Sequence, residues 1–383
     1  MHFEFSTTGR IVFGNGTIKQ LPNFANSFGK NAFIICGKDT SRIDSIVDTL
    51  NQAGIKTSVF SMPTEPTISL VLQGIHEARL KSCDIIIGIG GGSVIDTGKA
   101  ISAMITNSGE LSEYLEVIGE GKSIIKGPAP YIAIPTTAGT GAEVTCNAVL
   151  SSPEHKVKVS MRSPLMYPRM ALVDPELTYS TSPAITASTG LDALTQLLEA
   201  FVSNKANPFT DGICIEGLKR ASRSLYSAYT SGDISAREDM CLASLFSGLA
   251  LANAKLGAVH GLAAPLGGML SAPHGTICAR LLPFVIEMNV NSLIKKDPSS
   301  DFLKRFDTVA QILTKNDHAS AMEAVSWIKN ICSAMEIPVL KKFGLEESAL
   351  PAIVQQAKKS SSTKGNPVEL TDEELAQILR QAM

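Results

Sequence analysis

Charged residues are scarce in this sequence, and their scarcity excludes several classes of protein. They make up 18% of the 383 residues, and the formal net charge is −2, so we expect no nucleic-acid partner. No uninterrupted apolar run reaches the roughly 18 residues that cross a bilayer, and the N-terminus lacks the pattern of a signal peptide. We therefore predict a cytoplasmic protein that does not associate with membranes.

Paired cysteines are also missing. The seven cysteines are dispersed and form no CxxC pair, which indicates reduced cytosolic thiols rather than a disulfide framework. The chain is too long for one ordinary core, so two domains are expected.

The first half of the chain alternates buried strands with helices. Short apolar runs rich in β-branched residues predict strands at 31–37, 56–62, 84–91 and 131–137. Amphipathic segments at 41–54 and 68–82 predict helices between them. This alternation predicts a parallel sheet wrapped by helices, in an α/β dinucleotide-binding domain over residues 1–182.

From residue 183 to the end, long helical patterns replace the strand signal. Prolines punctuate these patterns, and Thr371 and Glu374 form a capping box before the last one. Residues 183–383 are therefore predicted to form an all-helical domain, and the family resemblance described below implies that this domain carries the metal and the substrate.

Two loops in the first half have the composition of a cofactor site. In "DIIIGIGGGSVIDTGKAIS", a strand leads through Gly91 and Gly92 to a helix, and Ser93 adds a hydroxyl. Backbone N–H groups at such a helix start favour an anion such as pyrophosphate, although a plain turn that needs small residues has the same composition. After the next strand, Thr136, Thr137 and Thr140 gather hydroxyls in "IAIPTTAGTGAEVT".

Polar residues in apolar helical segments mark a second candidate site. Asp192 and Gln196 are four residues apart on one helix face, and His260 and His274 lie in "GAVHGLAAPLGGMLSAPHG". A buried carboxylate needs a cation or donors, and a carboxylate with two imidazoles suits a divalent transition metal. The alternative is a pair of hydrogen-bonded core histidines with Asp192 capping a nearby group.

The ordered motifs resemble the iron-containing alcohol dehydrogenases, relatives of glycerol dehydrogenase and dehydroquinate synthase. They include "TTGRIVFGNG", "GIGGGSVIDTGKA", "IPTTAGTGAEVT", "ASTGLDALTQLLEAFVS" and "NAKLGAVHGLAAPLGGMLSAPHGTICARLLP". The resemblance implies a dehydroquinate synthase-like fold, a homodimer, and hydride transfer between NAD or NADP and a small alcohol or aldehyde. It matches Gly92 and Ser93 to pyrophosphate contacts, Thr136 and Thr137 to the nicotinamide riboside, and Lys158 to a ribose contact.

The resemblance also bears on the choice of cofactor. Members that prefer NAD resemble one another in an aspartate that ends the first strand of this domain, and Gly37 stands at the matching position. Without that carboxylate, Lys38, Ser41 and Arg42 could bind a 2′-phosphate, so NADP is predicted to be somewhat favoured. Asp39 would restore NAD preference if it points inward.

At the metal site, the family resemblance implies an aspartate and three histidines. Asp192, His260 and His274 match three ligands, whereas Gln196 replaces the fourth, and Ala264 replaces a histidine associated with proton relay. The candidate metal set is thus Asp192, Gln196, His260 and His274, for Fe²⁺ or Zn²⁺.

Several interpretations remain open at this point. Either the site binds a metal weakly, with Gln196 or water as the fourth ligand, or His260 or His274 acts as a general acid in a metal-independent reductase that resembles maleylacetate reductase. In either case, Asp192 orients or charges the site. A cyclase like dehydroquinate synthase needs basic residues for a phosphorylated substrate, and "HGLAAPLGGMLSAPHG" offers none. The last alternative is a cofactor-binding protein without catalytic activity.

Overall fold

The computed structural model describes residues 2–155 and 157–383, which form two compact units. One unit comprises Thr7–Thr137 and Gly141–Ser180. The other comprises Thr181–Met383 together with residues 2–6 and Ala138–Thr140. A single division after residue 182 does not account for the two short segments, which belong to the helical unit although they precede that residue.

The first unit is built on a parallel six-stranded sheet, in the order β1-β8-β5-β4-β2-β3. The four predicted strands are confirmed, and the structure adds a strand at each end of the unit. The strands are β1 (Ile11–Phe13), β2 (Asn31–Cys36), β3 (Lys56–Ser61), β4 (Ile85–Gly90), β5 (Tyr131–Pro135) and β8 (Met170–Val173).

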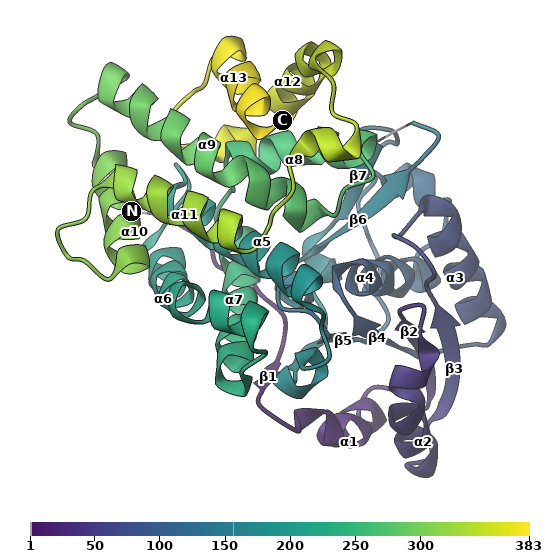
Figure 1. Ribbon diagram of the computed structural model, residues 1–383. Coiled ribbons are helices and arrows are strands. Elements are labelled where there is room, and N and C mark those ends of the chain that lie inside the picture. Colours follow the sequence, from purple (N-terminus) through teal and green to yellow (C-terminus); the bar gives the residue numbers. More distant parts are fainter. Residues whose placement is uncertain (1, 156) are drawn as a thin grey trace. The chain divides into compact units, whose positions relative to one another are not determined.

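Helices cover both faces of this sheet (Figure 1). Because side chains alternate along a strand, Phe33 and Ile35 pack on one face with α3 and α4, whereas Ile34 and its neighbours pack on the other face with α1 and α2. Both faces are buried, which explains the nearly continuous apolar strands. The helices are α1 (Leu21–Asn26), α2 (Asp44–Gln52), α3 (Ile68–Leu80) and α4 (Gly92–Thr106).

A separate antiparallel hairpin, which the sequence analysis did not predict, completes this unit. It pairs β6 (Asn147–Ser152) with β7 (Val157–Arg162) and packs against α4. Half of its residues are only partly buried, so it lacks the apolar runs that mark the central strands.

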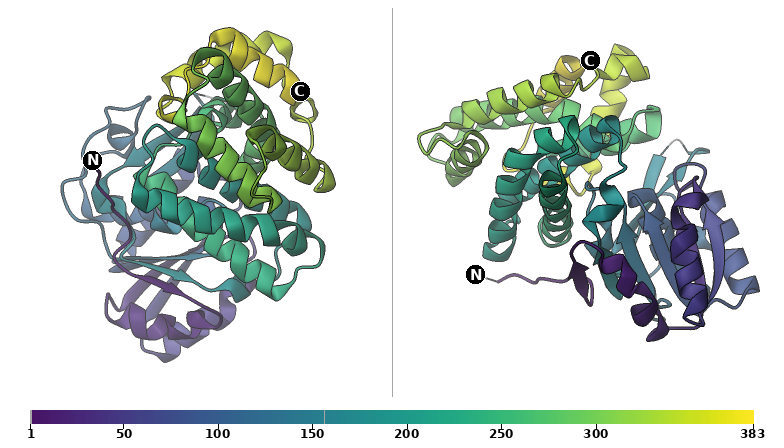
Figure 2. Two further views of the ribbon diagram at one scale, coloured as in Figure 1. Left: turned by 90° about the vertical axis from the view of Figure 1, so that its left-hand side faces the viewer. Right: turned by 60° about the horizontal axis from the view of Figure 1, so that its bottom comes forward.

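The second unit consists of helices, as Figure 2 shows from two further sides. They are α5 (Pro183–Val202), α6 (Pro208–Thr230), α7 (Ile234–Asn253), α8 (Ala258–Met269), α9 (His274–Lys296), α10 (Asp301–Thr314), α11 (Ala321–Ala334), α12 (Leu350–Lys359) and α13 (Asp372–Ala382). Helix α5 is buried along nearly its whole length and packs against α6, α7 and α9. The predicted capping box of Thr371 and Glu374 is confirmed at α13.

Two details of the helical unit differ from the sequence prediction. Pro265 and Pro283 do not end helices but lie inside α8 and α9, where tertiary packing outweighs the helix-breaking tendency of proline. Helix α9 is long and apolar enough to cross a bilayer, but 67% of that window is buried inside the protein, as in the core helix of a globular unit.

Candidate active site

Helix α5 contributes two of the predicted site residues from one face. Asp192 and Gln196 are 2% and 3% exposed, in a helix whose other buried residues are mostly apolar. The amide nitrogen of Gln196 lies 3.4 Å from Asp192 Oδ2 and donates a weak hydrogen bond to it. Burying a carboxylate here is costly unless further partners compensate its charge, so the surroundings of Asp192 define the site.

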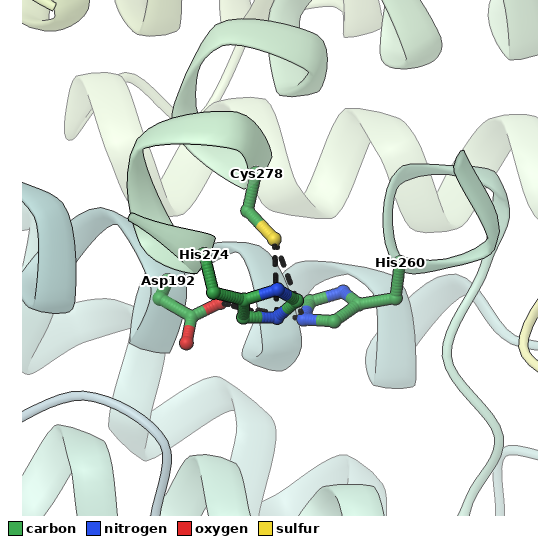
Figure 3. Close-up of side chains that lie close together, drawn as sticks. All are labelled: Asp192, His260, His274 and Cys278. Carbon is green, nitrogen blue, oxygen red and sulfur yellow. Dashed lines mark hydrogen bonds and ion pairs between the residues drawn. The ribbon is translucent and has the colours of Figure 1, made fainter. Parts of the chain in front are cut away.

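The two predicted histidines meet Asp192 from helices α8 and α9 (Figure 3). His260 lies in the first turn of α8, and its Nε2 atom is 3.3 Å from Asp192 Oδ1. His274 is the first residue of α9, and its Nε2 atom is 4.0 Å from the same oxygen. Its side chain is 37% exposed, so solvent reaches the cluster on that side.

Cys278 is a fourth member of the cluster that the sequence analysis missed. It lies one turn after His274 on α9 and is fully buried. Its Sγ atom is 3.7 Å from Nε2 of His260 and 3.6 Å from Nε2 of His274. One ligand atom from each of Asp192, His260, His274 and Cys278 lies within 4.8 Å of the others, close enough for one metal ion. The spacing of four residues from His274 was the available signal.

Glu199 is a second missed residue, and it holds His260 from the other side. It lies seven residues after Asp192 on α5 and is 3% exposed. Its Oε2 atom is 2.6 Å from Nδ1 of His260, and its Oε1 atom accepts a hydrogen bond from the backbone N–H of Val259 at 2.7 Å. The carboxylate therefore stabilises the N-terminus of α8 and directs Nε2 of His260 toward Asp192.

The electrostatics of the cluster favour a positive charge. Burial by itself raises the pKa of Asp192, but the hydrogen bond from His260 and the charge of His274 outweigh it and lower that pKa. The electrostatic influence of Cys278 is the largest on His274 and raises its pKa. Burial lowers the pKa of His260, yet its acidic and thiol neighbours raise it well above its usual value. The carboxylates and the sulfur thus create a potential that also attracts a metal cation.

Apart from Ala138–Thr140, the predicted cofactor loops lie in the other unit, at the carboxyl ends of its strands. Because β2, β4 and β5 are parallel neighbours, the segments that follow them meet at the same edge. Gly91 is the N-cap residue of α4 and has an extended backbone conformation. Among the described residues, no N-cap side chain accepts a hydrogen bond from the first N–H groups of this helix. The first N–H groups of α4, those of Gly92 and Ser93, are therefore free of intrahelical bonds, as a pyrophosphate site requires.

The segment after β2 carries the residues that bear on cofactor choice. No described residue approaches within 4 Å of a Cβ atom built on Gly37, so this position leaves open space. The carboxylate of Asp39 accepts hydrogen bonds from the backbone N–H of Ser41 at 3.2 Å and from its hydroxyl at 2.6 Å, and lies 3.8 Å from Nε of Arg42. The carboxylate of Asp39 therefore binds residues of its own turn, and the neighbouring Lys38 is exposed.

The remaining predicted cofactor residues are divided between the two units. Thr136 and Thr137 follow β5, where a Cβ on Gly91 would lie 3.3 Å from Oγ1 of Thr137. Thr140 belongs to the short segment of the helical unit. Lys158 lies on β7, and its Nζ atom forms an ion pair of 2.8 Å with Glu65, which lies in the segment after β3.

Comparisons with known proteins match nearly the whole chain. The family model for iron-containing alcohol dehydrogenase matches residues 8–175, and the model for the C-terminal part of the Fe-containing alcohol dehydrogenase family matches residues 186–383. Alcohol dehydrogenase 4 of Saccharomyces cerevisiae (strain YJM789) is 33% identical over 97% of this chain and 96% of its own length.

Two solved structures extend the similarity to the fold. A crystal structure of 1,3-propanediol oxidoreductase has a TM-score of 0.92 at 32% identity and covers 100% of both chains. The structure of sulfoacetaldehyde reductase from Bifidobacterium kashiwanohense, in complex with NAD⁺, has a TM-score of 0.87 at 29% identity, with 99% of this chain and 98% of that one covered. The substrates in these names differ in size and charge.

Proposed function

Because this chain belongs to the iron-containing alcohol dehydrogenase family and is an oxidoreductase acting on CH–OH groups, we propose that it reduces a small aldehyde or ketone with NAD(P)H. In this proposal the protein also catalyses the reverse reaction, and a divalent metal assists in both directions. The observation that carries the metal is the convergence of a carboxylate, two imidazoles and a thiol on one point of the helical unit. We propose no single substrate, since relatives that are 29–33% identical are named for different alcohols and aldehydes.

The residues present fit a metal ion. Oδ1 of Asp192 is buried, and its ion-pair partners are Nε2 of His260 at 3.3 Å and Nε2 of His274 at 4.0 Å. Such long contacts compensate a buried carboxylate oxygen only in part, and a cation facing it removes the remaining cost. Asp192, His260 and His274 would hold this ion, and when bound it would polarise the oxygen of the substrate as a Lewis acid.

Residues of the chain orient the ligands of that ion and determine the route by which a proton reaches the reduced substrate. Glu199 accepts the Nδ1 proton of His260, which leaves the lone pair of Nε2 directed at the cluster. Ala264, one turn after His260, has no proton to give or accept. The proton must therefore reach the alkoxide from water or from the cofactor's ribose hydroxyls, through the exposed side marked by His274.

We also propose that NADP is accepted and somewhat favoured over NAD. Support comes from the absence of a carboxylate at Gly37 and from the exposed ammonium of Lys38 beside it. The carboxylate of Asp39 binds Ser41 and Arg42, which further reduces its repulsion of a 2′-phosphate.

The cofactor proposal is tested by the ratio of kcat/KM for NADPH over NADH in the wild type and in Gly37→Asp. We expect a wild-type ratio of one or more and a decrease of roughly tenfold or more in the variant, because the new carboxylate repels the phosphate. Lys30→Ala, on the surface before β2, serves as the control. A wild-type ratio well below one would contradict the proposal.

The metal-assisted reaction is tested by metal analysis of protein purified without chelators, together with activity before and after EDTA. Stoichiometric Fe²⁺ or Zn²⁺ and activity that is lost with EDTA and restored by the metal are expected. Full activity in metal-free protein would instead favour the metal-independent reductase, and binding of NADPH without turnover of any aldehyde would favour a cofactor-binding protein.

A further inference from the structure

The helical unit offers a ligand set that differs from the one expected from sequence. Gln196 stands where a third imidazole was expected, and an amide oxygen is a poor ligand for Fe²⁺ or Zn²⁺. A thiol from another helix, that of Cys278 on α9, reaches the same point (Figure 3). The sulfur of Cys278 therefore takes the place of the missing ligand atom, although Cys278 is not at the sequence position where the family resemblance places that ligand.

Three of the four spacings below match one metal ion, and the fourth is about 0.7 Å longer than the bound distance. With metal–nitrogen bonds of about 2.0–2.1 Å and a metal–sulfur bond of about 2.3 Å, tetrahedral geometry puts nitrogen and sulfur about 3.6 Å apart. The Sγ atom of Cys278 lies 3.6 Å from Nε2 of His274 and 3.7 Å from Nε2 of His260. A bound oxygen and nitrogen would be about 3.3 Å apart. Asp192 Oδ1 lies 3.3 Å from His260 Nε2 and 4.0 Å from His274 Nε2.

Gln196 has a different place in this arrangement. Its amide nitrogen faces Asp192 Oδ2 at 3.4 Å, whereas the oxygen that faces the imidazoles is Oδ1. The amide thus holds one carboxylate oxygen and leaves the other for the cluster. Glu199 has the same relation to His260, since it binds the ring nitrogen that points away from the cluster. Both residues orient ligands rather than act as ligands.

We propose that Cys278 binds the metal as a thiolate, as the fourth protein ligand beside Asp192, His260 and His274, with Gln196 as a positioning residue for Asp192. This inference rests on the proposed function, because it concerns the metal of that same site. On binding, the S–H bond of Cys278 breaks, its proton passes to bulk water, and the sulfur electron pair forms the bond to the cation without a change of oxidation state. The thiolate and the carboxylate balance the two positive charges of the ion, and the sulfur favours Zn²⁺ or Fe²⁺ over Mg²⁺ and Mn²⁺.

Cobalt substitution provides a direct test. Full-length protein is freed of metal and titrated with Co²⁺, and thiolate-to-cobalt charge transfer is followed in the near-ultraviolet spectrum. We expect the wild type to develop this band with an end point at one equivalent. Cys278→Ser should lack the band and bind Co²⁺ roughly tenfold or more weakly, which corresponds to about 1.4 kcal/mol.

The matched control is Cys332→Ser, which alters a buried thiol of α11 in the same unit. Its Sγ atom donates to the backbone carbonyl of Ala279 on α9 and lies outside the cluster. We expect this variant to keep the full charge-transfer band. Should Cys278→Ser fail to fold, X-ray absorption of zinc-loaded wild type decides the question, because a sulfur neighbour at about 2.3 Å is expected there.

The outcomes separate this inference from the proposed function. Stoichiometric binding of Co²⁺ or Zn²⁺ without a sulfur signal in the wild type overturns the role of Cys278 and leaves the metal-assisted reaction intact. A band of wild-type intensity in Cys278→Ser does the same. If the wild type binds neither ion, both the metal-assisted reaction and the role of Cys278 are overturned.

Discussion

Replacing Glu199 by glutamine tests how the protein orients His260. In the wild type, one carboxylate oxygen accepts from the backbone N–H of Val259 at 2.7 Å and the other lies 2.6 Å from Nδ1 of His260. Glutamine has the same shape but only one acceptor oxygen. Whichever way the amide is turned, its NH₂ group faces either the backbone donor or the imidazole nitrogen.

The magnitude follows from these contacts. If the amide nitrogen faces His260, Nδ1 must accept its hydrogen bond, so the ring proton moves to Nε2 and blocks the atom directed at the cluster. Loss of such an outer partner weakens metal binding by about 10–100-fold, or ~1.4–2.7 kcal/mol. If the nitrogen faces Val259 instead, a buried donor at the start of α8 is left unpaired, which costs about 1–3 kcal/mol of folding free energy.

The assay is a competition titration of metal-free protein with Zn²⁺ against a chromophoric chelator, combined with urea denaturation of the metal-free form. Glu216→Gln serves as the control, because this half-exposed residue of α6 pairs with Arg220 and is not a member of the cluster. We expect the control to stay within about 0.5 kcal/mol of the wild type. If Glu199→Gln matches the wild type in both zinc affinity and stability, the role assigned to Glu199 is wrong.

Two further predictions concern stability. Burial raises the pKa of Glu143 from 4.5 to about 7, so between these pH values the folded protein holds a proton that the unfolded protein has lost. The free energy of unfolding therefore decreases as the pH rises from about 4.5 to about 7, by up to about 3 kcal/mol. Glu143→Gln should remove this component, so that urea denaturation at pH 5 and pH 8 shows a smaller pH difference than in the wild type; an unchanged difference would refute it. Gly275→Ala, next to His274, would place a Cβ 2.2 Å from the backbone oxygen of Ser188 and should destabilise by about 1–3 kcal/mol. In contrast, Gly212→Ala on the exposed face of α6, where no described residue comes within 4 Å, should stabilise by about 0.5–1 kcal/mol in the same assay, and equal effects would contradict the steric argument.

The sequence determined the class of fold because both units follow local rules. Fully buried parallel strands must be apolar on both faces, and helices repeat their apolar residues every three or four positions, so 31–37, 84–91 and the segments after 183 were predictable. The hairpin of β6 and β7 escaped detection because its half-exposed strands lack that apolar signal. The prediction that prolines separate the helices was wrong at Pro265, because tertiary packing outweighed the tendency of proline to end a helix.

For the candidate site, the sequence alone determined which residues are out of place in an apolar helix. Asp192, His260 and His274 stand out because a polar group there is costly unless it has a partner. Cys278 and Glu199 do not stand out, since a cysteine resembles a small core residue and a glutamate suits any helix surface. Only the packing of α8 and α9 against α5 decided that these two side chains face the histidines, because relative rotation and register between helices depend on contacts far apart in the chain.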